Sequence, residues 1–147
     1  MSQSAIFFPV LVQALLTLCV LILLGPARAR SMREAQQRLT DEDVRVGRNT
    51  WSEEATKVSN NFKNQFELPV LFYAVIAFAI ALKQADPVMT GLAWIFAVSR
   101  LAHAAIHVGP NVVMWRGVAY IIGAATLLVL WLLLGWRVYV GTVWAGG

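Results

Sequence analysis

Four long apolar segments constrain this chain more than any other feature of its sequence. They cover residues 5–25, 60–83, 87–108 and 112–134. An α-helix rises about 1.5 Å per residue and the hydrocarbon core of a bilayer is ~30 Å thick, so helices of this length can cross it. The sequence therefore predicts an all-α integral membrane protein, in which residues 1–147 form one domain built as a bundle of four transmembrane helices.

The composition supports a membrane protein and argues against a soluble one. The chain is 59% hydrophobic and 14% charged, which leaves too few polar residues to cover a soluble domain of this length. Its net charge of +4 is not gathered on a soluble module, so no nucleic-acid partner is expected. Membrane lipids are the expected surroundings.

Turn-forming residues separate the segments. Gly25-Pro26 is expected to end the first helix, Asp86-Pro87 to form the turn before the third, and Gly109-Pro110-Asn111 to precede the fourth. The apolar run 68–82 is too short to span a bilayer alone, so the second helix is expected to begin upstream, near residue 60.

The first segment has an alternative interpretation as a cleaved signal peptide, because Ala27-Arg28-Ala29 loosely resembles a cleavage site. No Lys or Arg precedes the segment, and its apolar run is longer than that of a signal peptide. A permanent transmembrane helix is therefore the favoured interpretation.

Basic residues are concentrated between the first and second segments. This connection, expected to be a solvated loop with a short helix around 33–39, holds eight of the twelve Lys and Arg residues: Arg28, Arg30, Arg33, Arg38, Arg45, Arg48, Lys57 and Lys63. Short connections rich in Lys and Arg stay on the cytoplasmic side of the membrane. Both termini are therefore expected on the opposite side, and the connection after residue 108 on the cytoplasmic side.

Polar residues inside the segments gather in the cytoplasmic leaflet. In one continuous helix, positions 60, 64 and 67 share a face, which gives a stripe of Asn60, Asn64 and Glu67. The third and fourth segments contribute polar residues at helical spacing near the same end, namely Arg100, His103, His107, Arg116 and Tyr120. Ionisable side chains in a span cost about 2.5–3.5 kcal/mol each, so they are normally paired or functional.

Two interpretations of these polar residues compete. In the structural one, Glu67 neutralises Arg100 and the amides form hydrogen bonds between helices. Arg116 fits it poorly, because the other acids of this leaflet lie in the connecting loop, and we expect Arg116 to meet an external anion. A metal site at His103 and His107 is not predicted, since only Glu67 could supply a third ligand.

The motifs resemble those of the MAPEG superfamily, the membrane-associated proteins in eicosanoid and glutathione metabolism. Asn64-x-x-Glu67-x-Pro69 is followed by Arg100-x-x-His103-x-x-x-His107 and by Arg116-x-x-x-Tyr120. The resemblance covers nearly the whole chain, and it is closest to bacterial members and to the microsomal glutathione transferase and prostaglandin E synthase branches.

This resemblance implies a homotrimer that binds glutathione between subunits in the cytoplasmic leaflet of a bacterial inner membrane. It places Asn64, Glu67, Arg100, His103, His107 and Tyr120 around glutathione, and assigns Arg116 to stabilising the thiolate. A nearby guanidinium does lower the pKa of a thiol. The implied activity is a glutathione-dependent transferase or peroxidase acting on lipophilic electrophiles or hydroperoxides.

The chain also departs from the family pattern. An arginine is usual where Asn60 stands, and a basic residue usual just before Arg116 is replaced by Val112, Val113 and Met114. Fewer cations hold a dianionic peptide less tightly. The alternative function is therefore a non-catalytic MAPEG-like membrane protein that binds a lipid or a protein partner. Arg116 with Tyr120 favours the enzyme, whereas Asn60 favours the alternative.

Reporter fusions test the expected topology. Eight Lys and Arg residues lie in the first connection, which should keep that connection on the cytoplasmic side. Reporters fused to the N-terminus and to Gly147 should therefore both give non-cytoplasmic signals. A cytoplasmic signal at either end would contradict the assignment of the polar residues to the cytoplasmic leaflet.

Overall fold

The computed structural model describes residues 3–36 and 51–145, and within these ranges all regular secondary structure is helical. The elements are η1 (Gln3–Ile6), α1 (Phe7–Gln36), α3 (Glu53–Asn64), α4 (Leu68–Ala81), α5 (Pro87–Val108) and α6 (Val113–Ala145). Four described stretches are long and apolar enough to cross a membrane, with α3 and α4 together forming the second. The predicted four spans are thus confirmed, and the chain is an integral multi-pass membrane protein.

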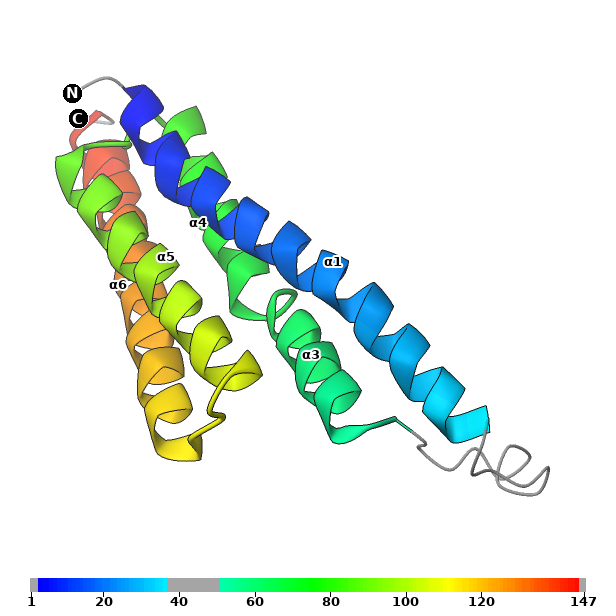
Figure 1. Ribbon diagram of the computed structural model, residues 1–147. Coiled ribbons are helices and arrows are strands. Elements are labelled where there is room, and N and C mark those ends of the chain that lie inside the picture. Colours follow the sequence, from blue (N-terminus) through cyan, green and yellow to red (C-terminus); the bar gives the residue numbers. More distant parts are fainter. Residues whose placement is uncertain (1–2, 37–50, 146–147) are drawn as a thin grey trace.

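The helices form an elongated bundle with two halves (Figure 1). α5 and α6 run side by side in opposite directions, and α1 lies obliquely across the bundle with α3 beside its second half. The start of α1 and the end of α6 lie at one end of the bundle, while the turn between α5 and α6 lies at the other. The polar residues that precede and follow this turn therefore share one end of the molecule.

The apolar core lies where α4, α5 and α6 meet. The rings of Phe72 and Phe96 stack there with centroids 4.3 Å apart, and neither side chain is exposed. Val75, Met89 and Leu130 are also fully buried in this cluster. Many apolar side chains of the outer surface are instead exposed, as expected for helices that face lipid rather than water.

The first helix does not end at Gly25-Pro26 as predicted, because α1 continues to Gln36. The helix that was expected near residues 33–39 is therefore in part the end of α1, and residues 37–39 lie outside the described ranges. Packing against α3 compensates for the hydrogen bond that Pro26 cannot donate. Next to it, Leu24 and Ala27 are buried against Ala55 and Val58.

The predicted continuous helix over 60–83 is also wrong, because residues 65–67 separate α3 from α4. Pro69 is the physical cause: it has no N–H to donate to the carbonyl of Gln65, and its ring would clash with that carbonyl. The proline is instead accommodated in the first turn of α4, where a missing N–H costs nothing. The second span therefore consists of two helices, α3 and α4, and the break between them contains the polar residues Gln65 and Glu67.

The fourth helix extends beyond the expected end at residue 134 and reaches Ala145. No proline interrupts this part of the sequence, and Arg137 ties it to the turn before α5. The Arg137 guanidinium donates to Asp86 Oδ2 at 2.7 Å and to the carbonyl of Gln84 at 3.2 Å. Asp86 lies in the turn expected for Asp86-Pro87 and also caps α5, since its Oδ1 accepts from the Met89 N–H at 2.8 Å.

Asp86 makes a pH-dependent contribution to stability that can be measured. The hydrogen bond from Arg137, more than the backbone bond from Met89, lowers the pKa of Asp86 below its ordinary value of 3.8. A lowered folded-state pKa means that this stability is present above about pH 4 and is lost as the pH falls through the folded-state value. Asp86→Asn preserves the cap and removes the charge, so it should destabilise the protein at pH 7 by less than about 1 kcal/mol.

Thermal melts of detergent-purified protein at pH 7 and at pH 3 test this expectation. The difference between wild type and Asp86→Asn should shrink at the lower pH, whereas Asp86→Ala, which also removes the cap, should remain destabilised at both. An equal difference between wild type and Asp86→Asn at both pH values would contradict a stabilising charge on Asp86.

Candidate functional site

A fully buried arginine stands at the centre of the polar end of the bundle. Arg100 on α5 is 0% exposed, and its NH2 group donates to the main-chain carbonyl of Asn64 at 3.1 Å. Asn64 is the last residue of α3, so the helix break leaves its carbonyl without a helical partner. The guanidinium also lies over the ring of Tyr120, 5.5 Å from its centroid.

The close approach of α6 holds Arg100 in this position. A Cβ atom built on Gly123 would lie 2.8 Å from Ser99 Oγ and 3.5 Å from Arg100 Cδ, so a larger residue at position 123 would require the Ser99 side chain to shift. Arg100 Nε and NH1 are buried and have no hydrogen-bond partner among the described residues. A buried N–H without a partner costs about 1–3 kcal/mol, so this guanidinium retains capacity to bind an acceptor.

His103 connects all three polar elements, one turn along α5 from Arg100. Its Nδ1 lies 3.1 Å from the main-chain carbonyl of Arg116, and its Nε2 lies 3.2 Å from Asn64 Nδ2. A carbonyl oxygen only accepts and an amide nitrogen only donates, so Nδ1 carries the proton and Nε2 is the acceptor. Both nitrogens of His103 are therefore engaged in holding α3 and α6 against α5.

The turn before α6 positions Arg116. Asn111 adopts a left-handed conformation with φ 50°, one that asparagine tolerates better than most residues, and its Oδ1 accepts from Arg116 NH1 at 2.6 Å. Arg116 forms no ion pair with a carboxylate in the described part of the chain. It lines an open pocket of about 280 Å³ together with His103, Val113, Gly117, Tyr120 and Ile121.

Tyr120 and His107 extend this cluster on either side of His103. The ring centroids of both residues lie 5.7 Å from that of His103. His107 is buried, and its Nδ1 forms no hydrogen bond within residues 3–36 and 51–145. In the same ranges no three His, Cys, Asp or Glu side chains come together in a group that could hold a metal ion.

Glu67 does not join the cluster in the way its spacing suggested. It lies in the break between α3 and α4, precedes the first turn of α4 without capping it, and is exposed. No hydrogen bond or ion pair joins it to Arg100 in the described structure, where Arg100 binds Asn64 and Tyr120 instead. Because Pro69 interrupts the helix, the single face expected for Asn60, Asn64 and Glu67 does not form.

A second polar cluster was not predicted from the sequence. Gln13 Nε2 donates to Gln65 Oε1 at 2.9 Å, and Gln65 Nε2 donates to Asn61 Oδ1 at 3.3 Å. The only signal in the sequence was Gln13 itself, which interrupts an otherwise apolar run. The partner role of Asn111 was also missed, because spacing along a helix carries no information about a turn residue.

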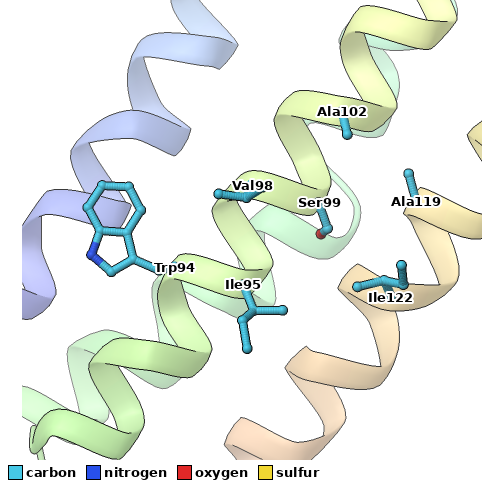
Figure 2. Close-up of a pocket in the computed structure, with 7 residues that line it drawn as sticks. All are labelled: Trp94, Ile95, Val98, Ser99, Ala102, Ala119 and Ile122. Atoms are coloured by element: carbon cyan, nitrogen blue, oxygen red, sulfur yellow. The ribbon is translucent and has the colours of Figure 1, made fainter.

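An apolar pocket of about 410 Å³ opens on a different face of the α5–α6 pair. Figure 2 shows Ile95 of α5 and Ile122 of α6 pointing toward one another across it, with Ser99 between the two helices. Trp94, Val98, Ala102 and Ala119 complete its lining. The pocket suits a hydrocarbon, since its lining is apolar apart from the Trp94 indole N–H and the Ser99 hydroxyl, and the latter donates to the carbonyl of Phe96 at 2.7 Å.

Replacement of each histidine by phenylalanine tests the bridging role of His103. His103→Phe keeps the ring but leaves the Asn64 amide and the Arg116 carbonyl without partners, which should cost about 1–3 kcal/mol. His107→Phe is the matched control and should cost less, because His107 Nδ1 makes no hydrogen bond among the described residues. Thermal melts in detergent measure both, and equal destabilisation would contradict the bridge.

Comparison with known families adds an independent finding. The model of the MAPEG family matches residues 6–136, from η1 into α6, and so includes every member of the Arg100–His103–Arg116 cluster. No curated protein and no solved structure matches the chain.

Proposed function

The chain belongs to the MAPEG family, and from that premise we propose that it is a glutathione-dependent transferase or peroxidase acting on lipophilic electrophiles or hydroperoxides. The observation that carries the proposal is the pair of cations at one end of the bundle. Arg100 is buried with two guanidinium nitrogens, Nε and NH1, unpaired, and Arg116 lines an open pocket without a carboxylate partner in the described structure. Such a site is suited to an anionic ligand.

Arg116 and Tyr120 are proposed to serve the sulfur of glutathione. A guanidinium beside a thiol stabilises the thiolate and lowers the pKa of the thiol, and the thiolate is the nucleophile. In the transferase reaction its sulfur forms a bond to an electrophilic carbon, and a leaving group departs with the electron pair. In the peroxidase reaction two molecules of glutathione reduce a hydroperoxide to an alcohol and water and become a disulfide.

Arg100, Asn64, His103, His107 and Glu67 are proposed to contact or position the peptide part of glutathione. The free N–H groups of Arg100 match a carboxylate, and the exposed Glu67 carboxylate matches an amine. We propose that a homotrimer completes the site, since the pocket beside Arg116 is open at the surface of a single chain. The lipophilic substrate would arrive from the membrane, which the apolar outer surface of α5 and α6 faces.

The proposed location is a bacterial inner membrane with both termini non-cytoplasmic. The bases of α1 and α3 support this orientation, because Arg28 and Arg30 in the second half of α1 contact Ser59 and Glu54 of α3, and Figure 1 shows these parts of the two helices toward the end of the bundle that also holds the turn between α5 and α6. Glutathione in the cytoplasm would then reach the cluster directly.

A non-catalytic MAPEG-like protein that binds a lipid or a protein partner is the alternative. It is favoured by the exposed Asn60, an amide where the family pattern has a cation, and by the absence of a hydrogen bond or ion pair from Glu67 to Arg100 in the described structure. Both features reduce the contacts available to a dianionic peptide.

Replacement of Arg116 tests the enzyme proposal. Arg116→Leu should retain glutathione, bound several-fold more weakly, and should lose the ultraviolet thiolate absorbance expected for the wild-type complex near neutral pH, because a hydrogen bond or ion pair to the charged form is removed. Arg116→Lys keeps the charge and should retain part of that absorbance. Difference spectra across pH, with calorimetric titration of glutathione, measure both effects.

Two controls accompany this experiment. Glu67→Gln should weaken glutathione binding without lowering the melting temperature, since Glu67 is exposed and has no ion pair to lose in the described structure. Native mass spectrometry of the same samples should give a trimer. Full thiolate signal in Arg116→Leu would refute its role, and a wild type with neither binding nor signal would favour the non-catalytic alternative.

A further inference from the structure

The guanidinium of Arg116 forms one hydrogen bond within the described structure, to the turn between α5 and α6. Its NH1 donates to Asn111 Oδ1 at 2.6 Å, a short distance of the kind that a charged donor gives. The main chain of Arg116 is held separately, since its carbonyl accepts from His103 and its N–H donates to the carbonyl of Val112 at 3.1 Å. The direction of the long side chain is therefore set by Asn111.

Asn111 is itself anchored to the end of α5. Its N–H donates to the carbonyl of Ile106 at 2.7 Å, and its φ of 50° lies in the left-handed region. Asparagine and aspartate tolerate this conformation and glycine adopts it without strain, whereas most other side chains are disfavoured. The turn thus presents the side-chain oxygen of Asn111 at a fixed place, and few residues could replace Asn111 without disturbing the backbone.

The acceptor that holds Arg116 carries no charge. A carboxylate at the same distance would form an ion pair and offset the positive charge of the guanidinium. The amide instead engages one of the five N–H donors and leaves the charge uncompensated, because no carboxylate of the described ranges pairs with Arg116. Asn111 also lies outside the lining of the pocket beside Arg116, so its effect on a ligand in that pocket passes through the guanidinium.

We propose that Asn111 is a positioning residue, which holds Arg116 at the pocket with a neutral acceptor so that the full charge of the guanidinium acts on the sulfur of the bound thiol. This inference rests on the proposed function, in which Arg116 stabilises the thiolate of glutathione. An aspartate at position 111 would hold Arg116 at least as firmly, yet it would weaken the thiolate. Stability and thiolate formation should therefore change in opposite directions.

Asn111→Asp and Asn111→Gly separate the charge of the acceptor from its presence. Both replacements tolerate the left-handed backbone, and only aspartate keeps an acceptor oxygen. Ultraviolet difference spectra of full-length, detergent-purified protein with glutathione give the apparent pKa of the bound thiol. Asn111→Asp should raise this pKa by about one pH unit or more relative to wild type, because the cation beside the thiolate is offset. Asn111→Gly should raise it less, since the charge remains and only its direction is lost.

Three further measurements distinguish this role from a structural one. Asn111→Asp should melt at or above the wild-type temperature, because it adds an ion pair to a bond that already exists. S-methylglutathione, which has no thiol to ionise, should bind wild type and Asn111→Asp with similar affinity in calorimetric titrations. Asn111→Asp combined with Arg116→Leu should give the thiol pKa of Arg116→Leu alone, because position 111 acts through Arg116.

The outcomes separate this inference from the proposed function. If wild type lowers the thiol pKa of bound glutathione and either Asn111→Asp or Asn111→Gly leaves that value unchanged, the inference is wrong and the proposed function stands. The inference is equally wrong if Asn111→Asp loses S-methylglutathione, or if the double variant raises the thiol pKa beyond that of Arg116→Leu. A wild type that binds no glutathione, or binds it with an ordinary thiol pKa, would overturn both.

Discussion

The hydrogen bond from Arg100 to the carbonyl of Asn64 is the interaction on which the polar end of the bundle depends. It exists because Pro69 cannot continue a helix through residues 65–68, so α3 ends and releases the carbonyl of its last residue. A continuous second helix would use that carbonyl internally and would leave the buried guanidinium with one acceptor fewer. The proline thus converts an apolar span into a place where a cation can be buried.

The remaining polar groups follow from the same break. Once α3 ends at Asn64, its side chain reaches His103 Nε2, while Gln65 turns back to Gln13 and Asn61. His103 in turn holds the carbonyl of Arg116 at the start of α6. Two amide and imidazole networks therefore stabilise the contacts of α3, one toward α5 and α6 and one toward α1. In a membrane, where no water is available, such pairing is what makes buried polar side chains tolerable.

The two clusters differ in what they leave unpaired. The cluster around Arg100 retains N–H groups of a cation next to a second cation and a phenol, which is suited to an anionic thiol peptide. The cluster around Gln65 leaves only neutral atoms unpaired among the described residues, the Asn61 Nδ2 donor and the Gln13 Oε1 acceptor, and both are buried. Charge, rather than the number of polar residues, distinguishes the two.

The sequence by itself determined the class of protein, the number of spans and the residues that gather at one end. Hydrophobic length sets the spans, and helical spacing together with the order of the segments brings Arg100, His103, Arg116 and Tyr120 to the same end, whatever the details of packing. The turn before α5 was also predicted, since Asp86-Pro87 is a local signal, whereas the cap that Asp86 forms was seen only in the structure. The spacing of these residues along the sequence does not show which of them contact a ligand.

Tertiary structure decided how two prolines behave and which polar groups meet. Pro26 is tolerated in α1 because α3 packs beside it, whereas Pro69 breaks the second span, a difference that local sequence does not contain. In the described structure Arg100 donates to the main-chain carbonyl of Asn64 at this break and forms no ion pair with Glu67, although helical periodicity had favoured the carboxylate. Gln65, which also bonds to Asn61, meets Gln13 only because α1 packs beside the end of α3. Periodicity describes one helix at a time, and a hydrogen bond between helices depends on where each helix ends and how closely its neighbour packs.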